Sequence, residues 1–180
     1  MQKNCLAKDQ IAVKIKEKIK KGIKRMTSIE EKVEDFFKKR LDQLKIKRYT
    51  KTESINRQIK EALKNAESKT GGKGGNYPDI QILLDDHKGR TIPVMIEVKG
   101  RKNKLEKLEK DQTISTKPSY VNNYAVNGAY HYGMAILQDK NCPYHEVIIV
   151  GISASNLEKD LEVKGYYIAK ENGYGLETAE

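Results

Sequence analysis

The stretch from Asn76 to Gly100, NYPDIQILLDDHKGRTIPVMIEVKG, decides the fold that the sequence predicts. Apolar and polar side chains alternate in residues 79–85 and again in residues 92–99, and this period of two indicates two β-strands. The polar segment between them ends in Gly89, as a short hairpin loop requires. The sequence therefore predicts an antiparallel β-hairpin.

The predicted hairpin brings three polar residues together at one end. Because its strands run antiparallel, Asp79 at the start of the first lies beside Glu97 and Lys99 at the end of the second. Glu97 and Lys99 share a face, and Val98 points into the opposite, apolar layer. Two carboxylates with an ammonium group nearby suit Mg²⁺, which binds one or two carboxylates and completes its octahedron with water and phosphate oxygens. The pattern therefore predicts a magnesium site.

Pro78-Asp79 followed by Glu97-Val98-Lys99 resembles the signature of the PD-(D/E)XK nuclease superfamily, and in particular the N-terminal nuclease domains of type I and type IIG restriction-modification enzymes. The pattern alone is weak, since 33% of the residues are charged. Its context strengthens it: a helical segment and a run of glycines precede the hairpin, and a helix followed by a strand comes after it. A solvated surface hairpin is the alternative interpretation.

The resemblance implies an α/β fold with a restriction-endonuclease-like core, a mixed central sheet flanked by helices, and an N-terminal helical extension. It implies a Mg²⁺-dependent endonuclease that hydrolyses phosphodiester bonds in DNA, with Mn²⁺ able to replace Mg²⁺. Asp79, Glu97 and the Val98 carbonyl would hold the metal, and Lys99 would be catalytic beside the two carboxylates. In such nucleases the helix before the hairpin often supplies a further glutamate, for which Glu53 is favoured over Glu61.

The same enzymes often have a Gln and a Tyr, spaced Q-x-x-x-Y, on the helix after the lysine strand. That spacing is absent here, and Asn123, Tyr124 and Asn127 are the nearest polar groups. The run of glycines at 71–75 lacks the Gly-Lys-Ser/Thr ending of a nucleotide-binding P-loop.

The positive charge of the chain is concentrated near its start. Residues 1–52 contain 17 basic and 7 acidic residues, which accounts for the whole net charge of +10. Such asymmetry favours a polyanionic partner, and DNA is the predicted one, although a solvated lysine-rich helix would show the same composition. Four basic residues near the predicted site are the candidates for contacting DNA: Lys73, Arg101, Lys102 and Lys104.

Periodicity predicts the remaining elements and three regions. Isoleucines recur every fourth residue from Ile11 to Ile23 and predict a basic helix, and Ser28 with Glu31 forms a capping box for a second helix. That helix should turn six apolar residues inward: Ile29, Val33, Phe36, Phe37, Leu41 and Leu44.

We expect further helices over residues 50–68, 105–110 and 119–132, and strands over 134–137, 147–152 and, as an edge strand, 163–169. The regions are a helical extension (1–50), a nuclease core (51–170) and a ragged tail (171–180).

The composition of the chain indicates its cellular location. The two cysteines, Cys5 and Cys142, are far apart and fit a reducing cytoplasm, and no apolar stretch suggests a membrane partner or an export signal. Predicted partners are DNA and methyltransferase, helicase or target-recognition modules. Three alternatives stay open: a repair or junction-resolving nuclease, a non-catalytic nucleic-acid-binding module, and a helical interaction module built on Ile11–Ile23.

Overall fold

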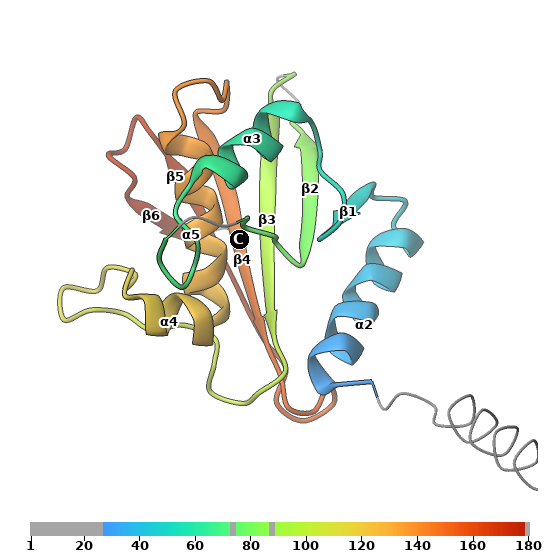
Figure 1. The fold of residues 1–180 in the computed structure, drawn as a ribbon. Coiled ribbons are helices and arrows are strands. Elements are labelled where there is room, and N and C mark those ends of the chain that lie inside the picture. Colours follow the sequence, from blue (N-terminus) through green and yellow to red (C-terminus); the bar gives the residue numbers. More distant parts are fainter. Residues whose placement is uncertain (1–26, 73–74, 87–88, 179–180) are drawn as a thin grey trace, which may run out of the picture.

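A mixed β-sheet forms the centre of the molecule. The computed structural model describes residues 27–72, 75–86 and 89–178, and within these ranges the strand order is β1-β2-β3-β4-β5-β6 (Figure 1). All neighbouring strands are antiparallel except β3 and β4, which are parallel. The strands are β1 (Arg48–Thr50), β2 (Ile80–Asp85), β3 (Thr91–Lys99), β4 (Glu146–Ser153), β5 (Glu162–Ala169) and β6 (Leu176–Thr178). The predicted α/β class with a mixed sheet and flanking helices is confirmed.

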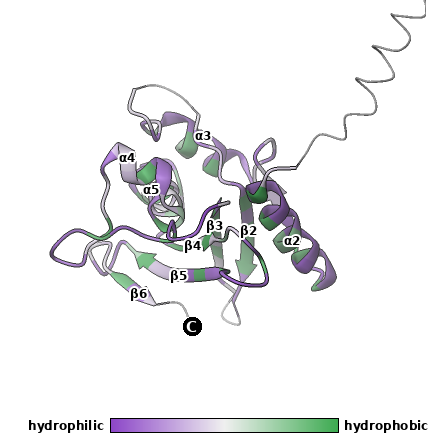
Figure 2. Ribbon diagram, turned by 90° about the horizontal axis from the view of Figure 1, so that it is seen from below, coloured by the Kyte–Doolittle hydropathy of each residue, from purple (hydrophilic) through white to green (hydrophobic). Residues whose placement is uncertain are grey.

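Helices cover both faces of this sheet. α4 (Pro118–Asn123) and α5 (Ala125–Gln138) form the crossover that two parallel neighbours require, and α5 packs with α3 (Arg57–Asn65) over one face. α2 (Ile29–Gln43) packs on the other face, where Val33 joins a cluster of buried residues from β2, β3 and β4. Figure 2 shows α5 and the edge-on sheet in cross-section, with α2 at one side. The sheet therefore has an apolar core on each face.

The hairpin has the predicted register. Ile80 lies opposite Ile96 and Gln81 opposite Met95, which places the start of β2 beside the end of β3. Val98 is fully buried in the cluster under α2, so Glu97 and Lys99 face the opposite side, toward α5. The alternation of side chains thus holds across both strands. β4 is central, as predicted.

The second predicted helix is confirmed at its start and corrected along its apolar face. The Ser28 side chain accepts a hydrogen bond from the Glu31 backbone N–H, and the Glu31 side chain accepts one from the Ser28 N–H, which is a complete capping box. Phe36, however, is 46% exposed, and Ile29 and Leu44 are exposed as well. The helix needs only a narrow stripe around Val33 and Phe37 to cover the sheet, so the prediction that Phe36 is a core residue was wrong.

The expected helix end at Gly133 was also wrong. α5 continues through Gly133 to Gln138, so the strand predicted over residues 134–137 is the last turn of the helix. A Cβ at Gly133 would lie 2.8 Å from Ile149 Cγ2. Glycine is therefore present because the helix approaches β4 closely, which a sequence pattern cannot distinguish from a stop signal.

The predictions for three further segments need correction. The segment before the hairpin contains β1 and a turn, and its helix spans only residues 57–65 with Asn56 as N-cap. Residues 105–110 are not helical; Leu108 instead forms an isolated bridge with Ile114. β5 is not an edge strand, because β6 pairs with it from within the segment predicted to be ragged.

Residues 29–50 pack on the sheet with the rest of the described chain: α2 covers one face and β1 pairs with β2. The predicted helix at Ile11–Ile23 lies outside the described residues. Across the described ranges, no helix combines the length and apolar character needed to cross a membrane.

Candidate active site at the end of the β2–β3 hairpin

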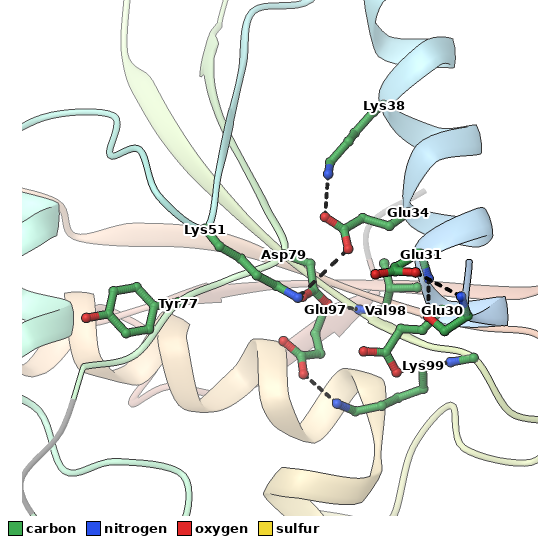
Figure 3. Close-up of polar contacts among 12 residues, drawn as sticks. Glu30, Glu31, Glu34, Lys38, Lys51, Tyr77, Asp79, Glu97, Val98 and Lys99 are labelled. Atoms are coloured by element: carbon green, nitrogen blue, oxygen red, sulfur yellow. Dashed lines mark hydrogen bonds and ion pairs between the residues drawn. The ribbon is translucent and has the colours of Figure 1, made fainter. Parts of the chain in front are cut away.

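Asp79 lies immediately before β2, with its carboxylate buried and fully engaged. The residue is 3% exposed. Its Oδ2 accepts a hydrogen bond from the Val98 backbone N–H at 2.7 Å, and its Oδ1 is 2.5 Å from the Lys51 ammonium (Figure 3). Burial, followed by the negative charge of Glu97, raises the pKa of Asp79 to about 6 despite Lys51 and Val98, which lower it. The carboxylate is thus held next to Glu97, and its raised pKa means that it takes up a proton at a higher pH than an ordinary aspartate does.

Glu97 on β3 is as deeply buried as Asp79 but is only half satisfied. Its Oε1 accepts hydrogen bonds from Lys69 Nζ and from Lys99 Nζ, each at 2.6 Å. Its Oε2 is buried and has no hydrogen-bond partner. Burial opposes ionisation of Glu97, but the two lysines outweigh it and lower its pKa, so the side chain is an anion. A buried carboxylate oxygen without a partner costs free energy unless a ligand fills the position.

Lys69 contacts Glu97 in the candidate site, and sequence analysis missed it. It lies just before the glycine-rich segment, and its side chain is 16% exposed with the ammonium over the Tyr132 ring at 4.4 Å. A Cβ at Gly128 on α5 would come within 3.1 Å of both Lys69 Nζ and Glu97 Cγ, so glycine makes room for this contact. Burial lowers the pKa of Lys69, and Glu97 partly offsets the effect. The site therefore has a second lysine on the carboxylate that Lys99 also contacts.

A third lysine and an unpredicted glutamate extend the site toward α2. Lys51, just after β1, lies between Asp79 and Glu34, whose Oε2 is 3.8 Å from the Lys51 ammonium. Glu34 is 8% exposed and also pairs with Lys38 on the next turn of α2. Burial lowers the pKa of Lys51, but Asp79, together with the charges of Glu34 and Glu97, outweighs burial and the net shift is upward. Figure 3 shows Glu34 reaching from α2 to Lys51 above the two site carboxylates.

Glu53, the glutamate favoured as a further ligand, does not join the site. Both Glu53 oxygen contacts are local: its Oε2 accepts from the Thr50 backbone N–H at 2.9 Å and from the Thr50 hydroxyl at 3.0 Å. Glu61 lies on α3 and is partly buried. Within the described ranges no three His, Cys, Asp or Glu side chains converge as a ready-made metal site. The structure thus brings together Asp79, Glu97 and Lys99 and leaves Glu53 apart.

The predicted DNA-contacting residues follow β3 directly. Arg101 and Lys102 are exposed, whereas Lys104 is partly buried with its ammonium over the Tyr124 ring at 4.6 Å. Their loop is fixed: the Ser153 hydroxyl donates to the Arg101 carbonyl at 2.7 Å. Lys73 lies outside the described residues. DNA contact by the four residues stays a prediction.

The polar residues of the crossover have structural contacts instead. Asn127 is fully buried, and its side-chain amide bonds to the Lys107 backbone N–H and carbonyl and to the Ser115 carbonyl. It therefore holds the 104–115 loop against α5. Tyr132 is the polar group of the helix that lies nearest the site: it donates to the Tyr77 carbonyl at 3.1 Å, and burial together with Glu97 and Asp79 raises its pKa far above the ordinary value.

Comparison with known proteins relates the chain to a restriction enzyme. No family model matches the chain, and no solved structure matches it. The chain is 31% identical over 122 residues to the type II restriction enzyme and methyltransferase RM.BcgI of Heyndrickxia coagulans. The match covers 68% of this chain but only 18% of that protein, so the chain spans less than a fifth of the length of its relative. A relationship to a restriction system is therefore supported.

Proposed function

We propose that the chain is a Mg²⁺-dependent endonuclease module of the PD-(D/E)XK type that cleaves DNA within a restriction-modification system. The observation that carries the proposal is the unpartnered Oε2 of Glu97, buried next to Asp79 with two lysines on the other oxygen. The mixed sheet, in which β3 and β4 are parallel, and the similarity to a restriction enzyme and methyltransferase support the same function. Methyltransferase, helicase or target-recognition modules would be its partners, and DNA its substrate.

The donor set fits a divalent cation. Asp79, immediately before β2, and Glu97 on β3 supply two carboxylates, the ligands that Mg²⁺ prefers, and the Val98 carbonyl would be the third protein ligand. A bound Mg²⁺ would polarise the scissile phosphate and lower the pKa of a water molecule. Lys51 would have to leave Asp79 Oδ1, and Glu34 lies close enough to receive its ammonium.

Lys99 and Lys69 would have different roles in the reaction. Lys99 and Lys69 both bind Glu97 Oε1, so Glu97 is held in one orientation with Oε2 left for a ligand. Lys99 lies at the end of β3 and would face the attacking water or the charge that develops on the phosphate. Lys69 is buried between Glu97 and Tyr132 and would act as a positioning residue.

The test is cleavage of supercoiled plasmid by the full chain in Mg²⁺, in Mn²⁺ and in EDTA. We expect nicking or linearisation with either metal, none in EDTA, and none with Asp79→Asn or Lys99→Met. The exposed Lys140, which lies in the turn after α5, gives a matched control in Lys140→Gln, expected to cleave like the wild type. Cleavage by Asp79→Asn at the wild-type rate, with circular dichroism unchanged, contradicts the proposal.

One observation favours a second candidate, a nucleic-acid-binding module without catalysis. Lysines already neutralise both carboxylates, Lys51 at Asp79 and Lys69 with Lys99 at Glu97, so the cluster is balanced without a metal ion. Calorimetric titration with Mn²⁺ separates the two functions. Binding that is lost in Asp79→Asn favours the nuclease; absence of heat in the wild type favours the binding module.

A further inference from the structure

A small cavity lies on the same face of β2 as Asp79, beyond Lys51. Its volume is about 130 Å³, below the roughly 300–1,000 Å³ of pockets that enclose whole drug-sized ligands. Its wall includes Gln81 from β2, Lys60 and Lys64 from α3, Lys51, and Tyr77. Gln81 is two residues from Asp79, which places the cavity about 7 Å along the strand from the site. A ligand there would be adjacent to the carboxylates but would not occupy their position.

The cavity wall contains an unsatisfied buried acceptor. Gln81 is 2% exposed, and its Nε2 donates to the Glu53 carbonyl at 3.2 Å. Its Oε1 is buried and has no hydrogen-bond partner. That contact fixes the orientation of the amide, because exchanging nitrogen and oxygen would set two acceptors against each other. Gln81 thus brings to the cavity wall a buried acceptor that a ligand N–H or O–H group would satisfy, and leaving that acceptor without a partner costs free energy.

The rim of the cavity is cationic. Three of its wall residues are lysines, Lys51, Lys60 and Lys64. The acid in the wall, Glu53, is engaged with Thr50. Lys51 also contacts Asp79 at 2.5 Å, so a single side chain links the cavity to the site. This charge distribution favours a ligand with a phosphate group next to the part that enters the cavity.

The mouth of the cavity has an exposed aromatic ring. Tyr77 is 61% exposed, although its carbonyl is fixed by the Tyr132 hydroxyl at 3.1 Å. A Cβ on Gly75 would lie 2.5 Å from Tyr77 Cζ, so the ring rests directly against the glycine backbone. Figure 3 shows the ring on the far side of Lys51 from Glu97 and Lys99, with its hydroxyl pointing away from them. An exposed ring on a fixed backbone is a suitable stacking surface for a nucleobase.

We propose that this cavity is a subsite for one unpaired nucleotide of a nucleic-acid strand. The base stacks on Tyr77 and donates an N–H group to Gln81 Oε1, and its phosphate lies against Lys51 and the lysines of α3. The position of this nucleotide next to the cleaved phosphate rests on the proposed function; binding of the nucleotide does not.

The test measures equilibrium binding in EDTA, where no cleavage occurs, by fluorescence anisotropy of labelled DNA duplexes with the full chain. One duplex has a single unpaired nucleotide, a second has an abasic residue at that position, and a third is fully paired. We expect the unpaired nucleotide to be bound roughly 5- to 150-fold more tightly than the abasic residue, the range of one stacked base. A single-stranded probe of the same sequence shows whether the duplex is needed.

Variants locate the effect. Gln81→Met and Tyr77→Ala should each abolish most of the preference for the base, whereas Tyr77→Phe, which keeps the ring, and Lys140→Gln, remote from the cavity wall, should retain it. Thermal melts identify any variant that fails to fold, and Tyr77, as an exposed side chain, tolerates replacement. Equal affinity of the wild type for base and abasic probes, or an unchanged preference in Tyr77→Ala, overturns the subsite. Plasmid cleavage assayed in parallel separates the outcomes, since a chain that cleaves without the preference keeps its function and loses the subsite.

Discussion

Two clusters of acids and bases lie at opposite ends of the parallel pair β3–β4, and they differ in burial. At the start of the strands, Glu146 contacts Arg90 through both oxygens and also accepts from the Tyr167 hydroxyl. Arg90 is 52% exposed on its side chain, so water screens this outer cluster. At the other end, Asp79 and Glu97 are 3% exposed, and Glu97 Oε2 has no partner. The outer cluster is partly exposed and its charges are satisfied within it, whereas a buried cluster with an unsatisfied oxygen is arranged for a ligand.

The sharpest test of this contrast exchanges one glutamate in each cluster for glutamine. Glu97→Gln removes the anion that would hold the metal, and plasmid cleavage should fall by roughly 10²-fold or more, as when an electrostatic stabiliser of a transition state is lost. Glu146→Gln, its matched control, should cleave within about twofold of the wild type, because Glu146 lies at the start of β4, at the opposite end of the parallel pair from the proposed metal ligands. Equal losses in both variants would remove the distinction between the clusters.

Lysines provide the second comparison. Lys69→Met removes the buried cation from Glu97, leaving Lys99 alone to orient the carboxylate, and cleavage should fall by roughly 10- to 100-fold, the range for residues that position metal ligands. Lys164→Met breaks an ion pair with Glu106 near the surface and should leave the rate unchanged. Mn²⁺ affinity should fall in the first variant only. If Lys69→Met binds Mn²⁺ and cleaves normally, Lys69 has no positioning role.

The hairpin and the positions of its three polar residues could be predicted because the geometry of paired strands fixes where each side chain lies. A period of two fixes the face of every side chain, and antiparallel pairing fixes which residues are neighbours, so Asp79, Glu97 and Lys99 could be placed together without tertiary information. The capping box of α2 was predictable for the same reason: its hydrogen bonds join residues three apart.

Lys69 and Glu34 could not be found in this way, because tertiary contacts place them. Lys69 lies in an irregular segment held by a hydrogen bond from Asn122 Nδ2 to its carbonyl at 3.0 Å, across 53 positions of sequence. Glu34 is one of several acids on a charged helix, and only the packing of α2 on the sheet selects it. Gly133 was misinterpreted because a glycine that ends a helix and a glycine that lets a helix pack closely on a sheet look the same in the sequence.

The raised pKa of Asp79 gives a third test, on stability. A carboxyl group whose folded pKa of about 6 exceeds its ordinary value of 3.8 favours folding most below pH 3.8, and this contribution is lost as the pH rises through 6. At pH 8 the ionised group therefore opposes folding, and Asp79→Asn, which can still accept from the Val98 N–H, should melt higher than the wild type. At pH 4 the difference should shrink. Thermal melts in EDTA at both pH values measure it, and a variant that is less stable at pH 8 contradicts the assignment.

The smallest expected effects distinguish two glycines of α5, one facing the site and one facing the core. Gly133→Ala places a Cβ 2.8 Å from Ile149 Cγ2, and the overpacking cost of about 1–3 kcal/mol should outweigh the gain of about 1 kcal/mol in helix propensity. The melting temperature should therefore fall while cleavage per folded molecule stays constant.

Gly128→Ala should show the reverse. Its Cβ would lie 3.1 Å from Glu97 Cγ and from Lys69 Nζ, a contact that a few tenths of an ångström relieve, so the helix-propensity gain keeps the melting temperature at or above that of the wild type. The displacement instead falls on the carboxylate and its buried lysine, and cleavage should drop, though less than in Lys69→Met. Both substitutions add one methyl group to the same helix. Opposite effects on stability and on rate would therefore show that Gly128 makes room for the site and Gly133 for the core; a common loss of stability would mean that Gly128, like Gly133, serves packing alone.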